Sequence, residues 1–186
     1  MNQIQNRNAG FSEMGKEAGR ILSNMKIFWS LVMIVGLIFV STFMGGCKVD
    51  PSVVKDTFAS IDDGTWEWKE VQKFQFDIKK ADYYYNIDVN LRITGKYAYS
   101  NLWMIGVLKG EGKNDTLQFQ AELADETGRW LGQGNGNVLT YRIPYKQNVI
   151  LKPGKYEFYL KQNVRTEKLG GITDVGIKVS EASAIL

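Results

Sequence analysis

Two stretches of the chain alternate strictly between apolar and polar residues. From Tyr85 to Ile93, and again from Leu117 to Leu123, every odd-numbered residue is apolar and every even-numbered residue is polar. A period of two is typical of a β-strand with one face buried and one face in water. Tyr156–Leu160 shows a similar alternation, whereas Trp103–Leu108 is apolar on both faces, which favours a strand in the middle of a sheet.

Weaker strand patterns and turn signals complete the prediction. Strand-like patterns also cover Phe74–Ile78, Val138–Ile143 and Ile172–Val179. Between the patterned stretches lie turn-forming residues, as in Gly110–Asp115 and Pro153-Gly154. No stretch from residue 66 to 179 has helical periodicity. The sequence therefore predicts an all-β domain, an antiparallel β-sandwich of the jelly-roll or immunoglobulin-like kind with about seven or eight strands, preceded by an N-terminal signal or anchor helix.

An uncharged apolar run, Ile27 to Met44, precedes the strand-patterned part. Its densest part has the length of a signal-peptide core, and the full run approaches the length of a membrane-spanning helix. A chain that starts at Met25 would have a leader of ordinary length, with the basic Lys26 before the run. We therefore expect residues 1–46 to be a signal peptide, with translation starting at Met25. We expect residues 47–63 to be a lipidated tether and residues 64–186 to be the β-sandwich domain.

The only cysteine of the chain, Cys47, stands just after this run. Met44-Gly45-Gly46-Cys47 resembles the lipobox of bacterial lipoproteins, which implies cleavage between Gly46 and Cys47 and a diacylglycerol on the cysteine sulfur. One acyl chain binds a membrane only weakly, so the further chain of a mature lipoprotein is what makes the anchoring stable. The alternative is an unmodified cysteine after an uncleaved single-pass helix. A lone cysteine at this boundary favours lipidation.

Charge argues against a nucleic-acid partner. The chain has 23 basic and 20 acidic residues, and the first 46 positions hold four of the basic and two of the acidic ones. The predicted mature part is left with 19 against 18, a net charge of +1. Nucleic-acid binding would require a clustered basic face. Because no cysteine follows Cys47, the predicted domain must also fold without disulfides.

The composition of the chain excludes the common kinds of catalytic site and metal site. The chain contains no histidine, which excludes Ser-His-Asp and Cys-His catalysis and the usual zinc sites. Acidic residues in or beside predicted turns usually form or cap those turns, and here they are Asp62, Asp63, Asp125, Glu126 and Asp174. The glycine-rich stretch Gly132–Gly136 is followed by a strand pattern and not by a helix, so we interpret it as a turn rather than a phosphate loop. We expect no enzyme, no cofactor and no metal.

Aromatic residues make up 12% of the chain. Such rings usually fill the core of a sandwich, because each one buries a large apolar area. Exposed rings can instead stack on sugars, and Trp66, Trp68 and Trp130 are the candidates for a glycan-binding surface. The two interpretations differ in one observable property, since a glycan platform requires these rings to be exposed together.

Three sequence blocks carry a family resemblance. Ser100-Asn-Leu-Trp103, Leu123–Gly134 (LADETGRWLGQG) and Gly170–Gly176 (GGITDVG), in this order behind the lipobox, are similar to the GldH family of gliding-motility lipoproteins. The resemblance covers essentially the whole predicted mature chain. It implies a lipid-anchored cell-envelope protein that is associated with the gliding machinery and has no established enzymatic role. The positions that match the family pattern are Asp125, Gly128, Trp130, Gly132, Asp174 and Gly176, although glycine and tryptophan at strand ends need no function beyond folding.

Two functional hypotheses follow. The first is a non-enzymatic lipoprotein of a motility or secretion assembly, which is anchored by acylated Cys47 and binds other envelope proteins. The second is a membrane-anchored glycan-binding module. Lys48, and not an aspartate, follows the cysteine, which favours the outer membrane under the sorting rule of some Gram-negative bacteria. We expect the domain to face the periplasm.

Overall fold

The computed structural model describes Trp29, Met33, residues 50–134 and residues 137–185. Cys47 and nearly all of the predicted signal peptide therefore lie outside the described residues. In the part of the chain that is described, no helix combines the length and the apolar character needed to cross a membrane. The chain from Asp50 onward clusters as a unit of its own.

Strands account for most of the described residues after Asp50. They are β1 (Val53–Ser60), β2 (Thr65–Glu67), β3 (Gln72–Ile78), β4 (Tyr83–Thr94), β5 (Asn101–Gly110), β6 (Lys113–Glu122), β7 (Val138–Ile150), β8 (Gly154–Gln162), β9 (Lys168–Gly170) and β10 (Ile172–Ala184). A single turn of 3-10 helix, η1 (Asp62–Gly64), separates β1 from β2.

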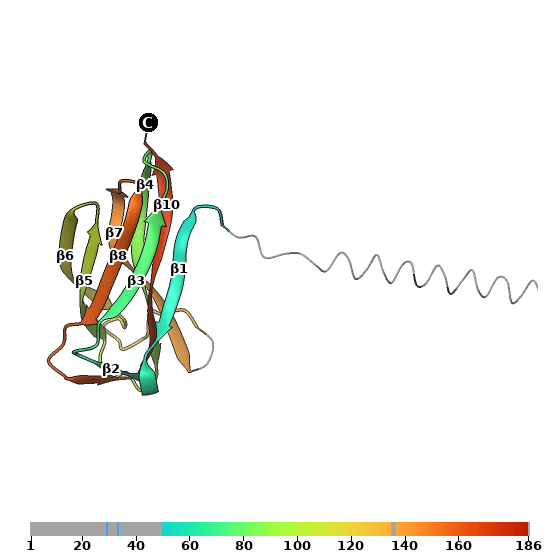
Figure 1. Ribbon diagram of the computed structural model, residues 1–186. Helices are drawn as coiled ribbons and strands as arrows, with labels where there is room; N and C mark the ends of the chain where they lie inside the picture. The colour runs from blue at the N-terminus through green and yellow to red at the C-terminus, as the bar shows by residue number, and fades with distance from the viewer. Residues whose placement is uncertain (1–28, 30–32, 34–49, 135–136, 186) are drawn as a thin grey trace, which may run out of the picture. The chain divides into compact units, whose positions relative to one another are not determined.

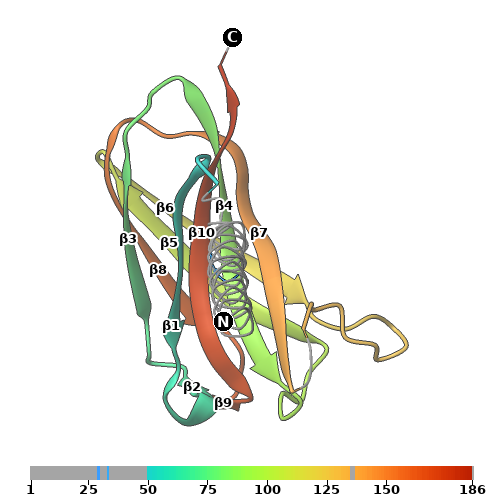
Figure 2. The ribbon, with the colours of Figure 1, turned by 90° about the vertical axis from the view of Figure 1, so that its right-hand side faces the viewer.

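Two antiparallel four-stranded sheets face each other (Figure 1). The first sheet has the order β1-β10-β4-β7 and the second has the order β3-β8-β5-β6. The short strands β2 and β9 form a separate two-stranded ribbon at one end of the sandwich (Figures 1 and 2). The predicted all-β antiparallel sandwich is thereby confirmed.

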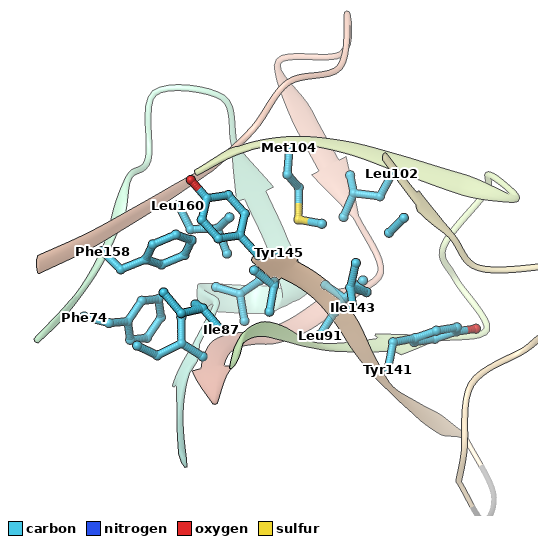
Figure 3. Close-up of a cluster of buried hydrophobic side chains, with 14 of the residues drawn as sticks. Phe74, Ile87, Leu91, Leu102, Met104, Tyr141, Ile143, Tyr145, Phe158 and Leu160 are labelled. Atoms are coloured by element: carbon cyan, nitrogen blue, oxygen red, sulfur yellow. The ribbon is translucent and has the colours of Figure 1, made fainter. Parts of the chain in front are cut away.

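The core lies between the two sheets and follows the alternation seen in the sequence. The odd-numbered residues from Tyr85 to Ile93 are at most 1% exposed, so one whole face of β4 is buried. Figure 3 shows side chains from both sheets meeting, with Ile87 and Leu91 from β4 and Met104 from β5. This shared apolar layer is the main source of stability, since the described chain has no disulfide.

Tyr145 of β7 joins the two sheets in the middle of the core. Its ring packs edge-on against Phe119 of β6 and Phe158 of β8, with ring centres 5.3 and 4.9 Å apart. Its hydroxyl donates a hydrogen bond of 3.0 Å to the carbonyl oxygen of Gly106. A Cβ at position 106 would lie 2.5 Å from the Tyr145 ring, so only glycine leaves room for it.

The predicted tether of residues 47–63 is wrong over Val53–Ser60, because these residues form β1 and pair with β10. Two features hide the strand in the sequence. The register shifts between Val53 and Lys55, which breaks the alternation. None of its side chains is fully buried either, because β1 is an edge strand. The domain therefore begins earlier than predicted.

One side of the sandwich is closed and the other is open. Strands β1 and β3, one from each sheet, approach each other along one side. On the opposite side the edge strands are β6 and β7, each of which has a single neighbouring strand in its sheet. This open side holds the hollows described next.

Candidate functional site

The predicted acylation residue, Cys47, lies outside the described residues, but the start of the fold is well defined. Asp50 caps a turn in which the amide and the hydroxyl of Ser52 donate to its carboxylate, at 3.0 and 2.8 Å. The hydroxyl bond is the main cause that lowers the pKa of Asp50 below its ordinary value. The carbonyl of Ser52 accepts from the amide of Glu181. The described part of the fold thus begins with a defined turn at Asp50, three residues after Cys47 in the sequence.

Four of the six family-pattern positions lie together in the loop Ala124–Gly134. Asp125 organises the tip of this loop, because its Oδ1 accepts from the amide and hydroxyl of Thr127 and from the amide of Arg129, at 2.7–3.0 Å. Its Oδ2 pairs with Arg129 Nε at 3.0 Å. These hydrogen bonds lower the pKa of Asp125 below its ordinary value, and the bond from the Thr127 hydroxyl is the largest cause. Gly128 has φ +82°, a left-handed conformation that favours glycine.

The same loop returns along β6 and then crosses to β7. Trp130 is half-buried and forms an antiparallel bridge with Ala124. A Cβ at Gly132 would lie 2.6 Å from the ring of Tyr141, so glycine allows the loop to approach the core. Gln133 then bridges to Thr140 of β7. The loop projects beyond the sheets (Figure 2, yellow to orange) and is held by its own hydrogen bonds.

The other two family-pattern positions lie on the outer face of the β1-β10-β4-β7 sheet. Asp174 accepts a hydrogen bond of 3.0 Å from the Ser60 hydroxyl and lies 3.9 Å from the Arg92 guanidinium. Gly176 of β10 is buried beside the neighbouring strand β1, where a Cβ would lie 2.0 Å from the Thr57 carbonyl oxygen. Asp174 therefore attaches the end of β1 to β10 through a hydrogen bond, and the absence of a side chain at Gly176 lets the two strands pair closely.

A polar network on this face was not singled out from the sequence. Asn90 is only 1% exposed, and its amide donates to Asp56 of β1 at 2.8 Å. Arg142 of β7 reaches both residues, with its Nε 3.3 Å from the Asn90 side-chain oxygen and its NH2 3.4 Å from Asp56. The network links three strands across the sheet. Asn90 and Arg142 occupy ordinary polar positions of alternating strands, so the sequence carries no signal that would mark them.

The three tryptophans considered as candidates for a glycan-binding surface are not exposed together. Trp66 is fully buried, and its indole N–H donates to the carbonyl of Glu70 at 3.2 Å. Trp68 is 51% exposed and Trp130 is half-buried. The alternative of a shared platform therefore fails at Trp66, which is a core residue as the first interpretation expects. Trp66 and Trp68 do not share a face, because β2 ends at Glu67 and Trp68 lies beyond the strand in a turn.

Three aromatic residues with exposed rings each contact residues 163–167, between β8 and β9. Trp68 donates its backbone N–H to the carbonyl of Glu167 at 2.8 Å. The hydroxyl of Tyr99 lies 3.5 Å from that of Thr166, and the carbonyl of Trp103 accepts from the amide of Asn163. These three rings are 38–51% exposed. Their exposure could not be read from the sequence, because it depends on which loops meet.

Of the five carboxylates considered for catalysis, two have structural partners, two lie in a turn, and Glu126 is exposed in the Ala124–Gly134 loop. Asp125 and Asp174 are engaged by the contacts described above, and Asp62 and Asp63 lie in η1. Asp63 has φ +50° within this turn. Among the described residues, no group of three or more His, Cys, Asp or Glu side chains could hold a metal ion.

Two hollows line the open side of the sandwich, between β6 and β7. The first, of about 510 Å³, lies at the β5–β6 hairpin and is lined by Leu108, Ile150 and Tyr156 among others. The second, of about 790 Å³, lies next to the Ala124–Gly134 loop. The Lys146 ammonium and the Asp115 carboxylate, which both line the first hollow, form an ion pair of 2.7 Å. The second hollow is the one that adjoins the family-pattern loop.

Comparison with known proteins gives one clear family match. The sequence matches the family described as GldH lipoprotein over residues 53–179. A Christiangramia forsetii protein named gliding motility lipoprotein GldH homolog is 31% identical over 156 residues, which cover 78% of this chain and 94% of that protein. The gliding motility lipoprotein GldH of Flavobacterium johnsoniae is 32% identical over 142 residues, which cover 71% of this chain and 87% of that protein.

Solved structures give only distant similarity. A family GH115 4-O-methyl-α-glucuronidase aligns with 75% of this chain at 13% identity and a TM-score of 0.40, and this chain covers 19% of that one. The VP2 subviral particle of infectious bursal disease virus aligns with 74% at 12% identity and a TM-score of 0.30, with 38% of that chain covered. Neither similarity supports a functional argument.

Proposed function

Because the chain belongs to the GldH family of gliding-motility lipoproteins, we propose that it is a non-enzymatic component of the gliding machinery of its host. In this proposal, acyl chains on Cys47 hold the β-sandwich at the outer membrane, facing the periplasm. The domain acts through contacts with other envelope proteins, including those of an associated secretion system. The observation that carries the proposal is the family match over residues 53–179, which spans nearly the whole sandwich.

The geometry of the family-pattern residues supports a role in binding rather than in turnover. Asp125, Gly128 and Gly132 shape a projecting loop that is held in one conformation by its own hydrogen bonds. Asp174 and Gly176 fix the edge strand that follows the anchor. A preformed loop costs little conformational entropy when a partner binds. These residues thus build and present a surface, and none of them forms a catalytic pair.

The anchor is tested with labelled palmitate and a Cys47→Ser variant. The wild-type protein should incorporate the label and fractionate with the outer membrane, because two or more acyl chains give stable anchoring. Cys47→Ser should incorporate no label and remain unprocessed. A wild-type protein without label would contradict the proposed anchor.

The role in motility is tested by deleting the gene in a gliding host and measuring colony spreading on agar. The deletion strain should not spread, and the wild-type gene should restore spreading. Cys47→Ser, expressed at an equal level, should fail to restore it. Normal spreading of the deletion strain would remove the proposed role.

A further inference from the structure

The outer edge of β6 presents a regular row of unpaired backbone groups. The β5–β6 hairpin closes with a two-residue turn in which Glu111 and Gly112 have φ of +45° and +73°, as in a type I′ turn. In such a hairpin the closing pair, Gly110 and Lys113, is hydrogen-bonded, and bonded and non-bonded pairs then alternate along the ladder. The odd-numbered residues of β6 therefore face β5, and the even-numbered ones direct their N–H and C=O groups outward.

The regular alternation ends with β6. Beyond it the amides of both Leu123 and Ala124 donate to the carbonyl of Ser100, at 2.8 and 3.0 Å. Within β6, where the register with β5 is regular, the amides of Thr116, Gln118 and Gln120 point to the free edge, where β6 has no neighbouring strand among the described residues. Their side chains are exposed as well.

The chain itself begins a further strand on this edge and then leaves it. Trp130 forms an antiparallel bridge with Ala124, and the amide of Leu131 donates to the carbonyl of Leu123 at 2.9 Å. After Leu131 the chain turns away at Gly132 and reaches β7 through the bridge from Gln133. The position in line with this short segment, alongside β6, is left open. An added strand would lie beside β6, on the same edge as this short segment.

The other sheet edges carry features that discourage strand addition. Strand β7 contains Pro144 and two register shifts opposite Tyr85–Asp88. Strand β1 has a register shift at Val53–Lys55 and lies close to β3, the remaining edge. Between Asn114 and Glu122, β6 contains no proline and its register with β5 is regular. Among the described strands, β6 is the edge best suited to accept a partner.

The larger hollow on the open side provides a place for the side chains of an added strand. Its wall includes Ala121 of β6, Leu131 of the loop and Ile143 of β7, and Leu131 is 48% exposed. Glu122 also lines it and has no ion-pair partner among the described residues. The nearby Arg142 pairs with Asp56 instead. The hollow thus offers apolar contacts and one uncompensated carboxylate.

We propose that the outer edge of β6 binds an extended segment of a partner protein by strand addition. The segment pairs its backbone with Thr116, Gln118 and Gln120, and places apolar side chains at alternate positions in the hollow. Because Glu122 is uncompensated, the segment carries a lysine or arginine at the end near the Ala124–Gly134 loop. This inference rests on the proposed role in protein–protein contact and names the kind of partner.

The direct test uses full-length protein in detergent and a phage-displayed library of short random peptides as the probe. Selected peptides should alternate apolar and polar residues and include a basic residue. They should also slow hydrogen exchange of the β6 amides. In Gln118→Pro the outward N–H is lost without removal of a bond to β5, so Kd should rise about tenfold or more. In Gln118→Ala the N–H is retained, and Kd should change by less than about twofold.

The matched pair separates backbone pairing from side-chain recognition. Equal losses in Gln118→Pro and Gln118→Ala would overturn the proposal, as would a selection in which no peptide protects β6. Peptides that protect the region of Trp68, Tyr99 and Trp103 instead would overturn it too. If circular dichroism shows that Gln118→Pro is unfolded, Gln120→Pro makes the same test.

Colony spreading in a gliding host distinguishes this inference from the proposed function. A deletion strain complemented with Gln118→Pro should fail to spread, while Gln118→Ala should spread normally at an equal protein level. Normal spreading by both variants, together with failure of the deletion strain, overturns strand addition at β6 but leaves the motility role in place. Normal spreading of the deletion strain removes the motility role, and the peptide measurements then decide the inference alone.

Discussion

Replacing Gly176 with alanine should loosen the attachment of β1 to the sheet. The added Cβ would lie 2.0 Å from the carbonyl oxygen of Thr57 and 3.0 Å from the Cα of Phe58. Both are backbone atoms of β1, so no side chain can rotate to relieve the contact. Ordinary contact begins at 3.4 Å, and the Thr57 carbonyl must therefore retreat by about 1.4 Å, the difference between the two distances. The strand has to shift as a whole.

The cost follows from the contacts that such a shift weakens. Thr57 pairs with Ile177, and the two ladder hydrogen bonds nearest this pair contribute about 1 kcal/mol each. The Arg92 guanidinium lies 4.0 Å above the Phe58 ring, a contact worth about 0.5–1 kcal/mol at an exposed site. With the steric strain of one extra methyl group, we expect a loss of about 2–4 kcal/mol. For a domain of this size, the melting temperature should fall by roughly 6–12 °C.

Thermal melts followed by circular dichroism, and urea unfolding followed by tryptophan fluorescence, measure the loss. Gly95→Ala is the matched control, because no atom lies within 4 Å of a Cβ at that position. It should match the wild-type protein or exceed it slightly. A Gly176→Ala protein as stable as Gly95→Ala would refute the reasoning. If that stable protein also failed to support gliding, Gly176 would have a functional role and not a structural one.

Three further changes test other parts of the fold. Glu111→Asn should stabilise the domain by about 0.5–1 kcal/mol in urea unfolding, because asparagine tolerates the positive φ of this type I′ turn better than glutamate does. Trp66→Ala should cost about 3–5 kcal/mol, whereas Trp68→Ala should stay within about 0.5 kcal/mol of wild type in the same assay. The pKa of Glu157 is lowered from 4.5 to about 2, chiefly by its hydrogen bond to the Lys73 ammonium. A lowered folded-state pKa means that the carboxylate stabilises the fold above pH 4.5 and loses this contribution as the pH falls toward 2. In acid titrations, Glu157→Gln should therefore lose less stability over this range than wild type.

Strict alternation was the most reliable guide to the fold. The alternation correctly predicts the inward residues of β4. This strand lies between β10 and β7 in its sheet, and its core face is buried from Tyr85 to Ile93. The same alternation was less informative for β6. Leu117 is on the predicted inner face and is nevertheless 36% exposed, because β6 stands at the open side of the sandwich. Periodicity gives the face of a strand but not its place in the sheet.

The candidate site was predicted in part. The blocks around Asp125 and Asp174 were noted from the sequence, and their structural contacts explain why those residue types suit those positions. The paired tryptophans show the limit. Trp66 and Trp68 are two residues apart and would share a face in a longer strand, but β2 is only three residues long. The polar network of Asn90 and the free edge of β6 depend on which strands become neighbours, and a single sequence does not record this.

The position of β1 has a mechanical consequence for an anchored protein. In the proposed anchoring through Cys47, a load reaches the described structure at the Asp50 turn, three residues later in the sequence, and then enters β1, which begins at Val53. The Ala124–Gly134 loop lies at the opposite end of the sandwich from this entry point (Figures 1 and 2). Tension applied along the strands would load the ladder between β1 and β10 in shear. Their ladder bonds must then give way together, which makes forced detachment much slower than opening the same bonds one at a time.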